Sequence, residues 1–411
     1  MKKVYCIDLF AGAGGLSEGF MRAGYKFFAH VEMDEAASLT LNTRQAFYFL
    51  KRNKRLNVYE DYLRGIINRD ELYSKVPKRI FNTVINKEIN KETIPYIFSK
   101  IDKIRKGRKV DIIIGGPPCQ AYSVIGRSRD PNGMQGDKRN YLYKEYIKFL
   151  NKYSPKLFVF ENVLGLLSAQ QGRIFKSMKK EFQESGYIID YRILNAKDFG
   201  VIENRRRIIL IGWRKDLNFS YPDLNINYNA HTIRELFEDL PSIQSGEMNN
   251  NYCKEVNKCL CDTHVRMKNW NVLSQHESRP NNERDLEIYR RCVFSWNNKK
   301  KKLKYNELPN ELITHSNKES FLDRFNIVPY DGICHTVVAH IGKDGHYYIH
   351  PDINQNRSIS IREAARIQSF PDDFYFESSR TAAFKQIGNA VPPLMAEIIA
   401  KSIKKSLNQV L

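Results

Sequence analysis

The chain has 411 residues and a formal net charge of +20. This length is enough for two or three domains with cores of their own, and the positive charge indicates a polyanionic partner, although frequent lysine makes part of that charge compositional. The seven cysteines are irregularly spaced, which favours a reducing compartment over a disulfide scaffold. No apolar run could span a bilayer, and Met1-Lys2-Lys3 leads directly into a predicted strand, so we expect a soluble cytoplasmic protein.

The N-terminus predicts a strand, a glycine loop and a helix. The apolar run 4–10 is followed by Ala11-Gly12-Ala13-Gly14-Gly15, and residues 16–23 have helical periodicity. Such a loop presents backbone N–H groups and the positive end of a helix to an anionic group. The spacing Gly-x-Gly-Gly differs from the dinucleotide fingerprint, so this loop alone is a weak signal.

A second predicted strand, 27–31, ends at Glu32-Met33-Asp34. An acid about twenty positions after a glycine loop suits ribose hydroxyls, and Met33 could lie against an adenine; the alternative is a charged strand end on a solvated loop. Residues 43–85 are rich in Lys, Arg and Tyr and predict a solvated helical insertion, with a DNA-facing arm as the alternative. Residues 83–89 resemble a further strand, with Glu88 near its end.

The chain is organised around Gly115-Gly116-Pro117-Pro118-Cys119-Gln120, which follows the predicted buried strand 110–114. The glycines permit a sharp turn and the prolines stiffen it. Cys119 is therefore expected on a rigid corner at the carboxyl end of a strand, where open α/β sheets bind ligands and a thiol can act as a nucleophile. The alternative is a buried cysteine beside an ordinary turn. The glycine-containing basic loop that continues to about residue 140 is expected to be a lid.

Two further polar groups border predicted strands. Glu161 ends the strand 157–160, where a carboxyl group can have a raised pKa and donate a proton; the alternative is a helix-capping acid. Glu203-Asn204-Arg205-Arg206-Arg207 precedes the strand 208–213. Alternation places Arg205 and Arg207 on one face, where they could bind phosphate or carbonyl oxygens; the alternative is a solvated charge cluster.

From about 215 to 355 the alternation of strands and helices is lost. The region is polar, contains the lysine run 299–302, and is predicted to be irregular and β-containing. Its thiols and a nearby histidine match no common zinc spacing, so we expect no metal site; these residues are Cys253, Cys259, Cys261 and His264. Residues 362–367 and 394–407 are predicted to be helical.

Five blocks, in this order, resemble the DNA (cytosine-5) methyltransferases, and bacterial modification enzymes in particular. The blocks are Asp8-Leu9-Phe10-Ala11-Gly12-x-Gly14-Gly15, Gly116-Pro117-Pro118-Cys119-Gln120, Glu161-Asn162-Val163, Arg362-Glu363-Ala364-x-Arg366-x-Gln368-x-Phe370-Pro371 and Gly388-Asn389-Ala390-Val391-Pro392. The resemblance covers nearly the whole chain except the insertion and the variable region. Two positions depart from the family pattern: Glu203 replaces the Gln of Gln-x-Arg-x-Arg, and Glu88 stands at the adenine-binding Asp.

The resemblance implies an α/β fold: a Rossmann-like S-adenosylmethionine-dependent methyltransferase sheet with a smaller, irregular β-containing target recognition domain. It assigns residues 1–213 and 384–411 to the catalytic and cofactor-binding domain, with the insertion at 43–85. Residues 214–383 would form the small domain, with the target recognition region at about 215–355.

The resemblance also implies a mechanism. Cys119 would attack C6 of a flipped-out cytosine, Glu161 would hold or protonate N3, Arg207 would bind O2, and Arg205 would order the loop or phosphates. The cofactor would be S-adenosyl-L-methionine. The residues expected to line its site are Asp8, Phe10, Gly12, Gly14, Gly15, Leu16, Glu32, Met33, Glu88, Ile89, Pro117, Asn389 and Val391.

The expected partners are double-stranded DNA and a restriction endonuclease acting on the same site, with no membrane and with a monomeric enzyme. Three other functions remain open from the residues. A nicotinamide-dependent oxidoreductase would leave Cys119, Glu161 and the arginines without a role. A non-catalytic nucleic-acid-binding protein would not need Cys119, Glu161 and Arg207 together. An RNA methyltransferase of the same family would not need so long a variable region, because base-edge reading of a duplex is what requires a dedicated module.

Overall fold

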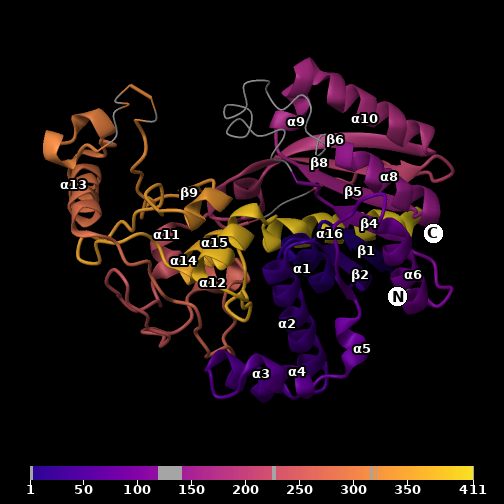
Figure 1. Ribbon diagram of the computed structural model, residues 1–411, viewed down its shortest axis with the longest axis horizontal. Coiled ribbons are helices and arrows are strands. Elements are labelled where there is room, and N and C mark those ends of the chain that lie inside the picture. The colour runs from indigo at the N-terminus through magenta and orange to yellow at the C-terminus, as the bar shows by residue number, and fades with distance from the viewer. Residues whose placement is uncertain are drawn as a thin grey trace.

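The computed structural model describes residues 3–118, 141–224, 228–314, 317, 319–320 and 322–410. A seven-stranded sheet in the order β3-β2-β1-β4-β5-β8-β6 forms its centre (Figure 1). The strands are β1 Tyr5–Leu9, β2 Lys26–Glu32, β3 Val84–Asn86, β4 Ile112–Gly115, β5 Leu157–Asn162, β6 Tyr187–Asn195 and β8 Arg206–Arg214. Strands β1 to β5 are parallel, whereas β8 is antiparallel to both β5 and β6.

The order of the strands reverses between β1 and β4. In open α/β sheets a crevice for ligands lies outside the carboxyl ends of the strands at such a switch point. The glycine loop follows β1 and the Gly-Gly-Pro-Pro turn follows β4. Both segments therefore begin at the edge of the sheet where a ligand is expected.

Helices cover both faces of the sheet, which explains the continuous apolar runs of its central strands. Alternate side chains of β4 point to opposite faces: Ile113 packs with α6, α8 and α10, whereas Ile112 and Ile114 pack with α1 and α16. These helices are α1 Gly15–Arg22, α6 Ile94–Arg105, α8 Leu142–Tyr153, α10 Arg173–Glu184 and α16 Pro393–Val410. The short helix α9 Gly165–Ser168 precedes α10.

The C-terminal helix returns to the start of the chain and packs on α1 (Figure 1). Gly19 makes this close approach possible, because a Cβ at this position would lie 2.4 Å from the backbone nitrogen of Glu397. The last helix thus forms part of the covering of the sheet, next to the glycine loop.

The insertion at 43–85 is helical, as its periodicity predicts. Between β2 and β3 the chain forms α2 Glu35–Arg52, α3 Leu56–Leu63, α4 Arg69–Ser74 and α5 Lys78–Phe81. The insertion is not simply solvated, because Phe47 and Tyr59 are buried with Trp270 and Val272 of the distant segment. The hydroxyl of Tyr62 also donates to Glu377 at 2.6 Å. These helices therefore connect the sheet to the part of the chain that follows β8.

Residues 215–383 form the second part of the molecule, which lies to the left of the sheet in Figure 1. The helices within it are α11 Ile233–Phe237, α12 Lys258–Asp262, α13 Glu283–Lys299 and α14 Ile361–Ile367, and α15 Arg380–Asn389 begins at its end and continues beyond it. Short 3-10 helices occur here and in the first part, at Ala169–Gly172, Ala196–Phe199, Tyr305–Glu307, Asn310–Leu312 and Ala339–Gly342. In the described part of this region, β structure is limited to β9 Cys334–His335, which pairs with β7 Glu203–Asn204, and to isolated bridges. The expected β content is thus small.

Buried ion pairs hold this irregular region together. The guanidinium of Arg366 is fully buried and binds Asp239 at 2.5 Å and Asp372 at 2.6 Å. Arg266 binds the same Asp239 at 2.7 Å. Charges in such a place are tolerated only when they are paired and hydrogen-bonded, so the region depends on these contacts being complete. Among the residues described, no helix has the length and apolarity needed to cross a bilayer.

Candidate active site

The glycine loop turns sharply between β1 and α1. Phe10, Gly12 and Gly14 all have positive φ angles, of 57°, 54° and 87°. A Cβ on Gly14 would meet the side chain of Leu41 at 2.7 Å, whereas a Cβ on Gly12 would meet nothing within 4 Å. Gly14 is therefore required by the fold itself, and Gly12 borders open space at the carboxyl edge of the sheet.

Glu32 fixes this loop from the end of β2. Its Oε2 accepts from the backbone N–H of Gly12 at 2.7 Å and its Oε1 from that of Asp34 at 2.8 Å. Burial raises the pKa of the Glu32 carboxyl, and these two N–H donors oppose the rise. Next to it, Met33 is 60% exposed, so its side chain is accessible to a ligand. Glu32 thus lies against the loop, and the exposed Met33 follows it in the chain. Their shared role in a cofactor site stays a prediction.

Asp8 and Leu16 lie behind the loop rather than on its open side. Asp8 is buried, and its Oδ2 accepts from Ser17 Oγ at 2.5 Å, which joins β1 to the first turn of α1. Leu16 is buried in the core beneath α1. In this structure both residues position the loop instead of facing outward, which differs from the expectation that they line the cofactor site directly.

Four further predicted cofactor residues come from two other segments. Glu88 is exposed after β3, and its neighbour Ile89 is buried. The C-terminal segment approaches the loop closely, because a Cβ on Gly15 would lie 2.2 Å from the carbonyl oxygen of Val391. Asn389, at the end of α15, is exposed. The structure thus brings Val391 against the glycine loop across more than 370 residues of sequence.

Glu161 and Arg207 form an ion pair beside the turn that leads to Cys119. Arg207 Nε lies 2.9 Å from Glu161 Oε1. A Cβ on Gly116 would lie 2.5 Å from Glu161 Oε2, so the absence of a side chain there lets the carboxylate contact the turn. Asn162 Nδ2 donates to the carbonyl oxygen of the buried Pro117 at 3.3 Å, which holds the same turn from β5.

Opposing effects act on the pKa of Glu161. Burial raises the pKa of its carboxyl, and the charges of Arg207 and Arg205 act in the other direction. The net effect is a raised pKa, so the protonated form of Glu161 is more available than that of an ordinary glutamate. Cys119, the predicted nucleophile, lies outside the described residues, as does the loop that follows it to residue 140.

Arg205 has a different environment from the one expected. Its side chain is fully buried, and its guanidinium donates to three backbone carbonyls: Val337 at 2.6 Å, Gly388 at 3.0 Å and Ala390 at 2.8 Å. A guanidinium held in this way does not reach a phosphate. Arg205 therefore joins separate segments of the fold, and the expected contact with phosphates is corrected to this buried role. The expected contact with the loop after Cys119 falls on residues outside the described ones and stays a prediction.

These features are those of an α/β protein with a glycine loop at the carboxyl edge of its sheet, and comparison with known proteins shows its family. The model of the family described as C-5 cytosine-specific DNA methylase matches residues 4–57 and 67–405. The chain belongs to this family.

Two relatives illustrate how this DNA methylase compares across its length. The type II methyltransferase M.Bpa9945I of Bacillus paralicheniformis is 40% identical over 98% of this chain and 99% of its own. The type II methyltransferase M.DdeI of Desulfomicrobium norvegicum is 32% identical over 97% of this chain and 88% of its own. The activity predicted from the sequence, that of a DNA (cytosine-5) methyltransferase of restriction-modification type, is confirmed by these matches.

Solved structures support the fold. A prophage-encoded protein of E. coli has a TM-score of 0.64 at 23% identity, covering 99% of this chain and 100% of its own. The methyltransferase EhMeth of Entamoeba histolytica has a TM-score of 0.55 at 15% identity, covering 100% of both chains. The predicted α/β methyltransferase sheet with a smaller second region is therefore confirmed.

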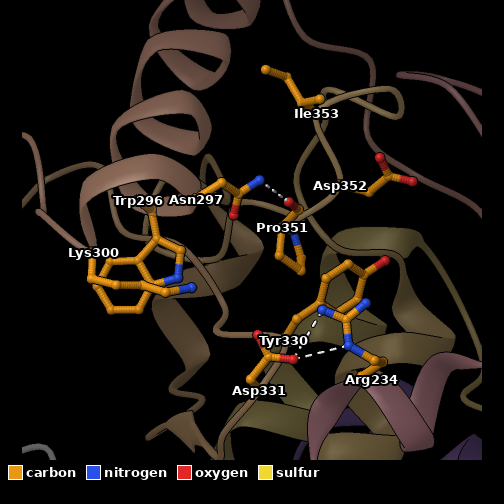
Figure 2. A pocket seen from close by; sticks show the side chains of 9 residues that line it. All are labelled: Arg234, Trp296, Asn297, Lys300, Tyr330, Asp331, Pro351, Asp352 and Ile353. Carbon is orange, nitrogen blue, oxygen red and sulfur yellow. Dashed lines mark hydrogen bonds and ion pairs between the residues drawn. The ribbon is translucent and has the colours of Figure 1, made fainter.

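The methylase has a separate cavity of about 370 Å³ in its second region (Figure 2). Arg234 stacks over the ring of Tyr330 at 4.5 Å and pairs with Asp331 at 2.9 Å. The full lining is Arg234, Trp296, Asn297, Lys300, Tyr330, Asp331, Pro351, Asp352 and Ile353. None of the predicted catalytic or cofactor residues is among them. Among the described residues, no group of His, Cys, Asp and Glu side chains is arranged to hold a metal ion.

Proposed function

We propose that this DNA (cytosine-5) methyltransferase acts through a covalent bond between Cys119 and C6 of a cytosine that has been flipped out of double-stranded DNA. The observation that supports the proposal best is the position of the Glu161–Arg207 pair. It contacts Gly116, three residues before Cys119, at the carboxyl ends of β4 and β5. A base bound there would meet a thiol, a proton donor and a guanidinium together.

Each group has a distinct task in this chemistry. C5 of cytosine is a poor nucleophile. When the Cys119 thiolate forms the S–C6 bond, the electrons of the C5–C6 double bond shift towards C4 and N3, and C5 becomes the nucleophilic carbon of an enamine. Glu161 holds a proton at N3, which limits the negative charge, and Arg207 donates to O2. S-adenosyl-L-methionine, when bound, would supply the methyl group, to which C5 bonds with its own electron pair. The cofactor's sulfonium sulfur would thereby become that of a neutral thioether. Loss of the C5 proton to a base and expulsion of Cys119 then restore the aromatic ring.

The residues around the glycine loop fit S-adenosyl-L-methionine. Gly12 borders open space, Glu32 presents a carboxylate beside it, and Met33 offers an exposed apolar surface. We assign Glu32 to the ribose hydroxyls and Met33 to the adenine, with Phe10 and the loop along the remainder of the molecule. The exposed Glu88 and Asn389 are available at the border of this site.

The wider setting follows from the family. Chemistry at C5 cannot take place inside a duplex, so the target base must leave the stack. We assign target recognition to about 215–355, where the Figure 2 cavity and the lysine run 299–302 lie. The names of the relatives as type II methyltransferases support a cognate restriction endonuclease. We further propose that the enzyme acts as a monomer in the cytoplasm.

The test is the product itself. Purified protein is incubated with labelled S-adenosyl-L-methionine and either duplex DNA or RNA, and methylated positions are mapped by bisulfite sequencing. We expect 5-methylcytosine within one short duplex sequence and none in RNA. Methyl transfer to RNA alone, or no transfer to any nucleic acid by a folded protein that binds S-adenosyl-L-methionine, would contradict the assignment.

A further inference from the structure

Glu203 and Arg205 both bind the backbone of Val337 in the second region. Glu203 Oε1 accepts from the backbone N–H of Val337 at 2.6 Å, and Arg205 Nη1 donates to the carbonyl oxygen of the same residue at 2.6 Å. Both side chains are fully buried. The backbone of β7 reinforces the contact, because β7 pairs in parallel with β9. In addition, Thr336 Oγ1 donates to the carbonyl oxygen of Asn204 at 2.6 Å.

The other side of the Arg205 guanidinium reaches the cofactor side of the molecule. Its Nη2 binds the carbonyl oxygens of Gly388 and Ala390. The next residue, Val391, is the one whose carbonyl oxygen excludes a side chain at Gly15 in the glycine loop. Arg205 thus joins a segment of the second region to the segment that borders the glycine loop.

Strand β8, which begins directly after Arg205, carries a proposed catalytic group. Arg207 lies two residues after Arg205 and pairs with Glu161. The charge of Arg205 lowers the pKa of Glu161, although less than that of Arg207 does. Glu203, Arg205, Arg207 and Glu161 therefore form a series of charges, with the two arginines between the two carboxyls, from the second region to the proposed proton donor.

From these contacts, which we interpret on the basis of the proposed function, we propose that Glu203 and Arg205 are positioning residues for methyl transfer. They fix the second region and the segment 388–391 relative to the Glu161–Arg207 pair. Loss of either side chain therefore changes the reaction rate through Glu161, not only through the stability of the fold.

The choice of an acid at 203 supports this view. The family pattern has Gln at this position, and a neutral amide could also accept from Val337. In this chain burial raises the pKa of Glu203 to about 7, with Arg205 and Arg207 opposing the rise, and Cys334 and Tyr348 are the other titratable groups that face it. In the described structure Glu203 Oε2 has no hydrogen-bond donor, and Arg205 Nη1 lies 3.6 Å from Oε1.

The sign of the electrostatic effect can be worked out. At low pH the Glu203 carboxyl is neutral and resembles glutamine. At higher pH its negative charge offsets that of Arg205, which favours the protonated form of Glu161 and keeps the proton donor available. The rate of the wild-type enzyme divided by that of Glu203→Gln should therefore rise with pH.

The experiment measures single-turnover methyl transfer from pH 6 to 8.5 on the full-length enzyme with duplex DNA. For Glu203→Gln we expect a wild-type to variant ratio near one at pH 6 that rises at least threefold by pH 8.5, with an inflection near pH 7. The matched control is Asp216→Asn, which removes an exposed carboxylate paired with Arg214 beyond the other end of β8. Its ratio should stay near one at every pH.

A second variant tests Arg205. Arg205→Lys keeps the charge but cannot reach all three carbonyls, so we expect at least a tenfold lower rate and at least fivefold weaker binding of S-adenosyl-L-homocysteine. If this variant does not fold, the Glu203→Gln series still decides the question. A ratio for Glu203→Gln that is constant or falls with pH, or a folded Arg205→Lys with wild-type rate and affinity, would overturn the proposal. An inactive wild-type enzyme would instead contradict the proposed function, so the two failures are distinguishable.

Discussion

Arg207 Nε lies 2.9 Å from Glu161 Oε1, where β8 begins and its antiparallel neighbour β5 ends. This pairing needs the reversal of direction in the sheet, because only an antiparallel β8 places the start of that strand beside the end of β5. The topology therefore supplies an acid and a guanidinium, both largely shielded from solvent, at one place next to the turn after β4.

The first prediction concerns this pair. Replacement of Glu161 by Gln removes the proton donor at N3 and should lower the single-turnover rate by about 10²–10⁴-fold. Because burial raises the pKa of Glu161, the wild-type rate should fall as pH increases past that pKa, and the residual activity of Glu161→Gln should lack this fall. Glu145→Gln, which removes a carboxylate paired with Lys148 on α8, serves as the control. Equal pH profiles for wild type and Glu161→Gln would argue against the assigned role.

The second prediction concerns the packing of the C-terminal segment on the glycine loop. Gly15→Ala places a Cβ 2.2 Å from the Val391 carbonyl oxygen, so the backbone must move. Overpacking of this kind costs about 1–3 kcal/mol, and the shift should also weaken binding of S-adenosyl-L-homocysteine, measured by calorimetry. In Gly332→Ala the added Cβ lies 3.9 Å from Pro329, so that variant should behave as wild type. Unchanged affinity and stability in Gly15→Ala would be inconsistent with this contact.

How far these features could be predicted depends on whether their cause is local. Strands β1, β4 and β5 were predictable because they are buried on both faces and so are continuous apolar runs. Strand β6 was not, because it is an edge strand paired only with β8, and its residues are mostly half-buried or exposed. Helix α13 was also missed, although Asn282 caps its N-terminus and apolar residues recur at 288, 289, 292 and 293.

The site shows the same distinction. The glycine loop follows β1, and Glu32, Glu161 and Arg207 lie at or near strand ends, so their placement at one edge of the sheet follows from the order of elements. The burial of Arg205 could not be seen, because its partners Val337, Gly388 and Ala390 are more than 130 residues away. The second region has no large sheet that alternation could reveal, and its buried ion pairs join residues far apart in the sequence.

The third prediction is a pH dependence of stability. Burial lowers the pKa of His276 to about 4, and its ring contacts Ser360 Oγ and the Pro241 carbonyl oxygen, both at 2.9 Å. The folded state therefore prefers the neutral ring. The stability that this preference contributes is complete above pH 6.5 and is lost as pH falls towards 4, by about 1–3 kcal/mol.

Urea unfolding at several pH values measures this effect. His276→Gln, which cannot take up a proton, should have a smaller loss of stability between pH 7 and 5 than the wild type. The charged neighbours Glu363, Arg357 and Arg366 are the same in both proteins, so the difference reports on the ring. Parallel pH curves would contradict the prediction.

The fourth prediction places sequence specificity in the region of about 215–355. Base-edge contacts are worth about 1–3 kcal/mol each and should be gathered in one module. Exchange of this region for that of a related enzyme with a known target should move the methylated site to the donor's sequence. The chimera must keep Asp239 and Arg266, because Arg366 depends on them. The map of 5-methylcytosine is the readout, and a soluble chimera that still marks the parent sequence would place specificity elsewhere.

The central claim is the covalent bond between Cys119 and C6, and trapping it is the most direct test. A duplex with 5-fluorocytosine at the target position cannot lose a proton from C5, so the enzyme should remain attached to the DNA after methyl transfer. We predict a denaturation-resistant complex in the presence of S-adenosyl-L-methionine, a mass spectrum that places the nucleotide on Cys119, and no complex with Cys119→Ser. Methylation of ordinary duplex without any trapped complex, or an attachment that persists in Cys119→Ser, would contradict the account.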